Sequence, residues 1–365
     1  MISRLFFAWT LRVCAAGIVA LAAVGVEAGG PASFMMLTHV NGRVLEGQPL
    51  DWDANSMLLL SRDGQLHEFA PKAAKNSKKT GPAFRGYTAS EMRGLLREEF
   101  DNRFQVTTTQ HFVVVHPRGE WRAWADRLES LYRSFTHSMQ VRGIRIREPL
   151  VPLVAVVFLN QSEYYRHAAS NGNPLAPGTL GHYDPKSNRI FLFDAASTSG
   201  DDWSVNAETI IHEATHQTAY NVGVHQRFAE QPRWLVEGLA MMFEARGVWD
   251  ARSTYTRTDR INFGRLLDFR YHQSSRPSGI IKSLVSSDQL FRTNPSLAYA
   301  ESWTLSFFLC ETEPRQYSRY LATVAARKSF QKYPAGERVA DFTSIFGSDL
   351  DMLEAQLWRY VEELP

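Results

Sequence analysis

The sequence contains only two cysteines, Cys14 and Cys310, in 365 residues. Cys14 lies in a segment that we expect to be removed, and Cys310 alone cannot form an internal disulfide. We therefore expect no disulfide in the mature protein, and we expect Cys310 to be a buried apolar residue. Cysteine usage gives no indication of the cellular compartment.

The chain also has no large excess of charge of either sign. Its formal net charge is +2, and no long basic stripe interleaved with aromatic residues is present, so nucleic acid is not an expected partner. Hydrophobic residues make up 44% and charged residues 21%, which is typical of a globular protein and not of a disordered one. The length allows one large domain or two ordinary ones, and no internal repeat is visible.

No apolar run at the N-terminus is long enough to span a bilayer comfortably. The chain begins with a segment carrying Arg4 and Arg12, followed by a short apolar stretch over Val13 to Val26. Val26-Glu27-Ala28 then provides small residues at the positions read by a signal peptidase. This pattern predicts a signal peptide over residues 1–28 that is cleaved after Ala28, with an uncleaved anchor as the alternative. The mature protein is then exported, either periplasmic or secreted, without stable membrane insertion.

Residues 29–70 have the pattern of a small β module. Asn41-Gly42 and Asp63-Gly64 each separate short apolar runs, which is typical of β-hairpins. Residues 71–82 are rich in lysine and contain Ser, Gly and Pro, so we expect a solvated linker there. A binding patch formed by Lys72, Lys75, Lys78 and Lys79 is the alternative.

Residues 83–250 predict a mixed α/β domain, and residues 251–365 predict a helical C-terminal lobe. The continuous apolar run Leu153–Leu159 is typical of a buried central strand. Further expected elements are a strand at 111–116, helices from 121 and 162, a hairpin over 181–193, a helix capped by Asp202 or Ser204, and helices at 296–312, 314–329 and 348–364, the last capped by Ser348.

The segment His212-Glu213-Ala214-Thr215-His216 matches the pattern His-Glu-x-x-His. Positions i and i+4 of a helix share one face, so both imidazoles can reach a single Zn²⁺. Glu213 then lies beside the metal without needing to bind it, which suits a general base acting on water. Two surface histidines on an amphipathic helix are the alternative.

A catalytic zinc site usually has a third protein ligand. Metzincins use a histidine six residues after the second one, but that position is Val222 here. His225 fits no familiar spacing. Glu237 lies 20 intervening residues beyond His216, on a second helix that we expect to begin at Pro232. That separation allows a turn and a return helix beside the first.

The segment Trp234-Leu235-Val236-Glu237-Gly238-Leu239-Ala240, placed after the His-Glu-x-x-His helix, resembles the gluzincin metallopeptidases of the peptidase MA-like clan. It is similar to their aminopeptidase branch, and more similar to an uncharacterised family of secreted bacterial proteins. The resemblance extends over residues 111 to 309. It implies a zincin-like fold with a mixed sheet and an active-site helix, zinc bound by His212, His216 and Glu237, and Glu213 as the base.

The resemblance also suggests a donor for the developing oxyanion. Gluzincin aminopeptidases often use a tyrosine some sixty residues past the Glu ligand, and Tyr299 lies 62 residues past Glu237. A core or interface tyrosine is the alternative, and His182 and Tyr183 are weaker candidates. Glu244 and Glu208 either orient a histidine or are solvated. The strand Arg189–Phe193 is expected at a sheet edge, where an extended substrate can pair.

Two family motifs are missing. The Gly-x-Met-Glu-Asn motif with which the aminopeptidases hold a free amino terminus is absent, and so is the Asn-Glu-x-x-Ser-Asp pattern of thermolysin-like enzymes. Our leading hypothesis is an exported α+β zinc metallopeptidase that acts on peptides or proteins. The alternatives are a catalytically silent zinc-binding scaffold and a zinc hydrolase of a non-peptide amide such as a cell-wall linkage.

Overall fold

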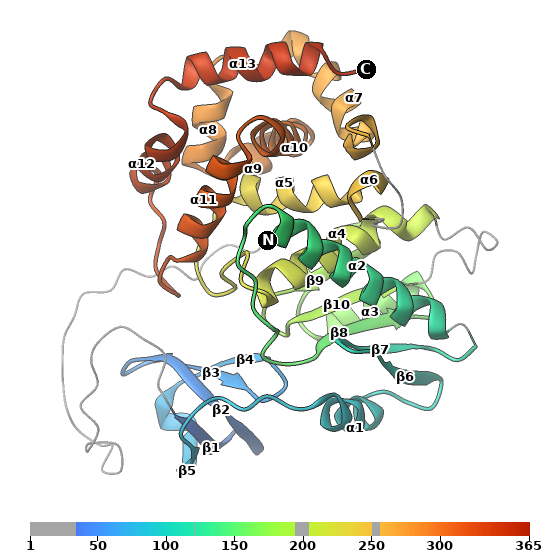
Figure 1. Ribbon diagram of the computed structural model, residues 1–365. Coiled ribbons are helices and arrows are strands. Elements are labelled where there is room, and N and C mark those ends of the chain that lie inside the picture. Colours follow the sequence, from blue (N-terminus) through green and yellow to red (C-terminus); the bar gives the residue numbers. More distant parts are fainter. Residues whose placement is uncertain (1–33, 120, 194–203, 250–255) are drawn as a thin grey trace.

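The computed structural model describes residues 34–119, 121–193, 204–249 and 256–365, which form two β-sheets and a larger number of helices (Figure 1). The α+β class predicted from the sequence is therefore confirmed. The expected signal peptide, with Cys14, lies outside the described residues, as does Asp202. Among the described residues, no helix is long and apolar enough to cross a membrane.

The first sheet forms the N-terminal β module. Its strands are β1 (Met35–Val40), β2 (Arg43–Trp52), β3 (Met57–Ser61), β4 (Leu66–Phe69) and β5 (Ala74–Gly81), in the order β4-β3-β2-β1-β5. Asn41 and Gly42 connect β1 to β2 with φ angles of 50° and 80°. A type I′ hairpin turn requires positive φ at both positions, so the predicted hairpin is confirmed.

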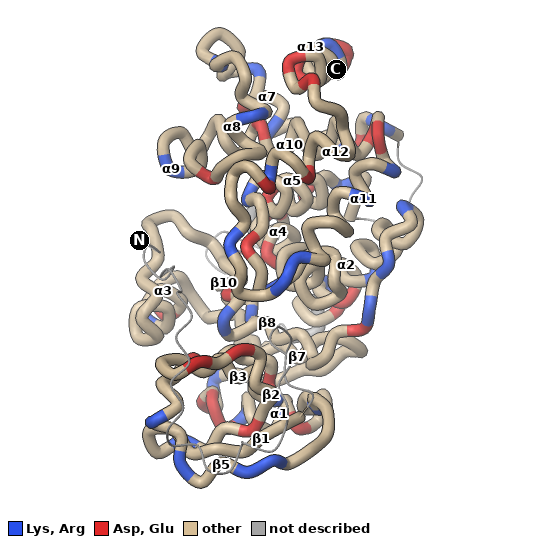
Figure 2. Tube along the Cα trace, turned by 90° about the vertical axis from the view of Figure 1, so that its left-hand side faces the viewer, with Lys and Arg blue, Asp and Glu red and all other residues tan. Residues whose placement is uncertain are grey.

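The prediction of a linker over residues 71–82 is wrong. Pro71–Ala73 is a short 3₁₀ helix, and β5 pairs antiparallel with β1, so that Lys78 lies opposite Leu37. The lysines are exposed, as they would be in a linker. β5 is an edge strand, and blue segments along it mark its lysines in Figure 2. Edge strands often carry lysine, which discourages pairing with other chains. The module thus runs on to Gly81 and does not end at residue 70.

The second sheet also has five strands and follows the β module in the sequence. Its strands are β6 (Phe104–Thr108), β7 (Phe112–Pro117), β8 (Leu153–Phe158), β9 (Gly181–Asp184) and β10 (Arg189–Phe193), in the order β6-β7-β8-β10-β9. β7, β8 and β10 are parallel, and the two outer strands are antiparallel to their neighbours.

The expectation that Arg189–Phe193 lies at the sheet edge is wrong, because β10 lies between β8 and β9. Every residue of β10 is buried, whereas most of β9 is half-buried. The hairpin itself is confirmed, but its outer strand is β9.

Helices cover both faces of this sheet. Leu153, Ala155 and Val157 of β8 belong to the core beneath α2 (Trp121–Val141) and α4 (Ser204–Asn221). The alternate residues Val154, Val156 and Phe158 pack with α1 (Ala89–Glu99) and α3 (Gln161–Ser170) on the other face. Because side chains alternate across a strand, one apolar run supplies two cores, which explains the unbroken hydrophobicity of β8.

The rest of the chain is helical, as predicted (Figure 1). Its α-helices are α5 (Arg233–Glu244), α6 (Arg246–Trp249), α7 (Phe263–Tyr271), α8 (Ile280–Ser286), α9 (Leu290–Thr293), α10 (Pro295–Thr312), α11 (Pro314–Ala325), α12 (Ala335–Phe346) and α13 (Leu350–Glu362). Asp349, and not Ser348, caps α13 by accepting a hydrogen bond from the backbone N–H of Met352. Cys310 is buried, as expected.

These helices share a core with the α/β region. One cluster of buried apolar residues extends from Phe112 on β7 to Leu364 at the C-terminus. α10 lies at its centre, where it packs against α5 and α7. The helices after residue 250 are therefore joined to the sheet through α5 and α4 by continuous packing.

Candidate metal centre

The His-Glu-x-x-His segment lies on α4, and α5 packs beside it. Gly223 follows α4 with a φ of 86°, a left-handed conformation that glycine adopts without strain and that turns the chain back. α5 then begins directly after Pro232, as the sequence predicted. This return brings Glu237 to the face of α4 that carries His212 and His216.

Three potential ligand atoms meet between the two helices. The Nε2 atoms of His212 and His216 are 2.9 Å apart, and Glu237 Oε2 lies 3.3 Å from the first and 3.5 Å from the second. Two ligand atoms that share a tetrahedral zinc at about 2.05 Å are roughly 3.3 Å apart. Within the described ranges, no other group of three His, Cys, Asp or Glu residues brings its potential ligand atoms this close together.

Glu244 orients the ring of His212. Its Oε1 lies 2.8 Å from His212 Nδ1, and its Oε2 accepts a 2.6 Å hydrogen bond from the side-chain amide of Asn262. A carboxylate at Nδ1 holds the proton there, so the Nε2 lone pair of His212 faces the cluster. Of the two roles considered for Glu244, the orienting contact is the one observed. Glu208, by contrast, is exposed.

The electrostatics of the cluster favour a cation at its centre. Burial alone would lower the pKa of His212, but hydrogen bonds to Glu237 and Glu244 and the charge of Glu213 raise it well above its usual value. Burial alone would raise the pKa of Glu237, but the two histidines hold it well below its usual range. Two imidazoles and a carboxylate converge on this point, so a proton or a metal ion is needed there.

Glu213 lies next to the cluster without being part of it. Its Oε2 accepts a 2.6 Å hydrogen bond from the backbone N–H of Tyr183 on the edge strand β9. That N–H points away from β10, and no strand among the described residues pairs with this side of β9, so the outer edge of β9 faces Glu213. The carboxylate thus lies between the candidate ligands and an unpaired strand edge.

The side chains of His182 and Tyr183 are engaged elsewhere. His182 Nδ1 lies 2.7 Å from the Tyr164 hydroxyl, and burial lowers the pKa of His182. The Tyr183 hydroxyl donates a 2.8 Å hydrogen bond to Asn188, and its ring stacks on Tyr220. The Tyr183 hydroxyl is therefore already used, which argues against it as the oxyanion donor, whereas in His182 only Nδ1 is engaged.

Tyr299, on α10, reaches the site through Arg233. Arg233 Nη2 donates a 2.9 Å hydrogen bond to the Tyr299 hydroxyl, and Arg233 Nε donates a 3.3 Å hydrogen bond to Glu237 Oε1. Burial and the charge of Glu237 raise the pKa of Tyr299, so the phenol keeps its proton at neutral pH. Arg233 was not among the residues expected at the site, although its spacing of four residues from Glu237 on a predicted helix is that of an ion pair.

His225 lies outside the ligand cluster. It is buried, its ring centre is 5.5 Å from that of Tyr220, and burial lowers its pKa to about 3. His225 is therefore a neutral residue of the turn between α4 and α5.

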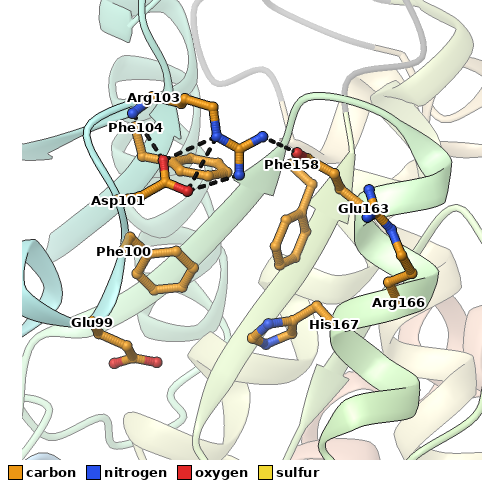
Figure 3. Close-up of a pocket in the computed structure, with 9 residues that line it drawn as sticks. All are labelled: Glu99, Phe100, Asp101, Arg103, Phe104, Phe158, Glu163, Arg166 and His167. Atoms are coloured by element: carbon orange, nitrogen blue, oxygen red, sulfur yellow. Dashed lines mark hydrogen bonds and ion pairs between the residues drawn. The ribbon is translucent and has the colours of Figure 1, made fainter.

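A separate surface pocket of about 300 Å³ lies on the opposite face of the sheet, between the end of α1 and α3 (Figure 3). Phe100, Phe158 and His167 line it. At its rim, Arg103 pairs with Asp101 and Glu163. None of His212, His216 and Glu237 lines this pocket, so the candidate metal centre and this pocket are distinct places on the molecule.

Comparison with known families gives one match. Residues 206–331 match the model of a family described as a protein of unknown function (DUF1570). The matched segment runs from α4 to just beyond α11, so it contains the three candidate ligands, Glu213 and Tyr299, but neither sheet. No curated protein sequence matches the chain.

Proposed function

We propose that this protein is an exported zinc-dependent peptidase with a zincin-like catalytic domain. The observation that carries the proposal is the meeting of His212 Nε2, His216 Nε2 and Glu237 Oε2 beside a carboxylate, Glu213, that is not one of the three. The position of α4 against a mixed sheet with a free edge strand supports the zincin-like assignment.

The donor set suits zinc. Two neutral imidazoles and one carboxylate are common ligands of catalytic zinc, and three protein ligands leave a fourth position for water or substrate. When bound, zinc supplies a Lewis acid that polarises the scissile carbonyl and increases the acidity of water. Arg233 contacts the outer oxygen of Glu237, and Glu244 contacts the outer ring nitrogen of His212. These contacts preorganise the cluster for one ion.

Glu213 acts as the general base and then as the general acid. It takes a proton from the attacking water and delivers it to the departing amine nitrogen. The backbone N–H of Tyr183, which bonds Glu213, fixes the orientation of the carboxylate. Tyr299 donates a hydrogen bond to the carbonyl oxygen as negative charge develops there.

A peptide substrate binds in extended form along β9. In the part of the chain that the structure describes, no strand lies on the outer side of β9, and the Tyr183 N–H on that side contacts Glu213. Pairing of main chains along such an edge holds peptides with little dependence on their side chains. The N-terminal pattern that ends at Ala28 supports the proposal of export.

The test is Glu213→Gln, compared with Glu208→Gln as the matched control on the same helix. A proteome-derived peptide library is digested with the parent and with each variant, and bound zinc is measured in all three. We expect Glu213→Gln to keep its zinc and lose cleavage by roughly 10²–10⁴-fold, because a general base contributes about that much. Glu208 is exposed, so Glu208→Gln should cleave like the parent.

Cleavage by Glu213→Gln at the parent rate would show the mechanism to be wrong. Zinc binding without any Glu213-dependent cleavage of peptides would support the silent scaffold. Glu213-dependent release of fragments from purified peptidoglycan, with intact peptides left uncut, would support the non-peptide amide hydrolase.

A further inference from the structure

Arg233 links two helices at the metal centre. It is the first residue of α5, and its planar guanidinium donates to Glu237 on the same helix and to Tyr299 on α10. The guanidinium also lies 4.5 Å above the centre of the Phe291 ring. A planar group with fixed donors and a stacked face has little freedom to turn, so both of its partners are held together.

The first hydrogen bond determines which oxygen of Glu237 faces the histidines. Oε2 lies 3.3 Å from His212 Nε2 and 3.5 Å from His216 Nε2, whereas Oε1 accepts the hydrogen bond from Arg233. The carboxylate therefore presents a single oxygen to the cluster. Without Arg233, the second oxygen would be free to rotate toward the same point.

The second hydrogen bond determines what the Tyr299 hydroxyl can do. A guanidinium only donates, so the phenol oxygen is the acceptor, and its own O–H proton is not used in this contact. Within the described part of the chain, no other hydrogen bond of this hydroxyl is found. Arg233 thereby leaves Tyr299 with a proton to donate.

We propose that Arg233 is a positioning residue that makes Glu237 a one-oxygen metal ligand and Tyr299 a hydrogen-bond donor to the substrate carbonyl. This inference rests on the proposed function. A plain surface ion pair between residues i and i+4 would contribute almost nothing. Arg233 differs from such a pair because it contacts three side chains from α5, α9 and α10.

Arg265 provides a matched control. Its guanidinium carbon lies 5.8 Å from the centre of the same Tyr299 ring, compared with 5.7 Å for Arg233. The side chains are similarly exposed, at 33% and 44%. Arg265 pairs with Asp268 instead of with the site. Replacing Arg265 thus removes an equal charge near Tyr299 but none of the hydrogen bonds at issue.

The experiment compares Arg233→Gln, Arg233→Lys, Arg265→Gln, Tyr299→Phe and the double variant Arg233→Gln/Tyr299→Phe. Zinc affinity is measured by competition with a chelator, kcat and KM are measured on one peptide cleaved by the parent, and thermal unfolding confirms folding. We expect Arg233→Gln to bind zinc about tenfold more weakly and to lose about 10–100-fold in kcat, with KM nearly unchanged. Arg233→Lys should not restore kcat, because a single ammonium group cannot reproduce the planar guanidinium that donates to both Glu237 and Tyr299.

The double variant tests the link between the two partners. We expect its kcat to be close to that of the worse single variant, because both substitutions remove the same arrangement. Arg265→Gln should match the parent in zinc affinity. The inference is overturned if Arg233→Gln binds zinc like Arg265→Gln, or if the two single losses multiply in the double variant. The comparison of zinc affinities tests the contact between Arg233 and Glu237 without any cleavage. This test therefore does not depend on whether the peptidase proposal is right.

Discussion

His212, Glu237 and Glu213 are each held by a contact outside the cluster. Glu244 orients His212, Arg233 holds the second oxygen of Glu237, and the Tyr183 N–H binds Glu213. The spacing of His212 and His216 predicted that both share one helix face, whereas the resemblance to gluzincins pointed to Glu237 as the third candidate ligand. The sequence could not predict the Tyr183 contact, because that contact depends on how β9 packs against α4.

The buried histidine His116, which lies away from the candidate site, leads to a prediction about how stability depends on pH. His116 on β7 is buried, with Nδ1 2.8 Å from the Pro117 carbonyl and Nε2 2.8 Å from the Thr107 hydroxyl. Both contacts suit a neutral ring, and burial lowers the pKa of His116. In the unfolded chain its pKa is ordinary, about 6.5, so below that pH the unfolded state binds more protons and stability falls.

We therefore expect the free energy of unfolding of the parent to decrease as the pH falls from 7.5 to 5.5. His116→Gln should show a smaller decrease, with a difference of up to about 1.4 kcal/mol. Urea unfolding at the two pH values measures this. His137→Gln, at an exposed position on α2, is the control and should follow the parent. Equal pH dependence in the parent and in His116→Gln would contradict the assignment of a neutral buried ring.

At the scale of elements, the contact between α5 and α10 sets the position of Glu237. A Cβ atom added to Gly238 would lie 2.4 Å from the Ser302 carbonyl oxygen and 2.1 Å from Ser306 Oγ. Only a residue without a side chain fits this approach. The glycine that follows Glu237 in the sequence motif thus has a packing role.

Gly238→Ala should destabilise the protein by about 1–3 kcal/mol, because overpacking forces the two helices apart. It should also weaken zinc binding, since Glu237 is the adjacent residue. Gly94→Ala on α1 is the matched control, because a Cβ there meets nothing within 4 Å. That variant should gain about 0.5–1 kcal/mol from better helix propensity. Denaturant unfolding compares them, and a neutral or stabilising Gly238→Ala would contradict the close packing.

Helices α2 and α13 could be predicted because their apolar residues recur at helical spacing, and β8 could be predicted because its apolar run is unbroken. Strand β5 could not, because its exposed residues carry the composition of a loop and its pairing with β1 is a backbone property. The order of β9 and β10 did have a sequence signal that the edge prediction overlooked. Residues 190–193 of β10 are all apolar, which is typical of a buried inner strand, whereas β9 reads Gly-His-Tyr-Asp.

At the scale of the whole molecule, the site is assembled from segments far apart in the sequence. The ligands come from α4 and α5, Tyr299 comes from α10, and Asn262, which holds Glu244, lies just before α7. The β module also contacts the hairpin beside the site. The N–H of Leu66 donates to the Lys186 carbonyl, and Arg227 bridges the carbonyls of Gly64 and Pro185. These long-range contacts have no local sequence signal.

The central claim is that His212, His216 and Glu237 form one metal centre. The most direct test is metal analysis of the purified parent and of Glu237→Gln, with the zinc affinity of each obtained by chelator competition. The account predicts one zinc per chain in the parent, and an affinity at least about tenfold lower in Glu237→Gln, because a ligand carboxylate is lost. A parent that binds no zinc, or a Glu237→Gln variant that binds it as tightly as the parent, would contradict the account.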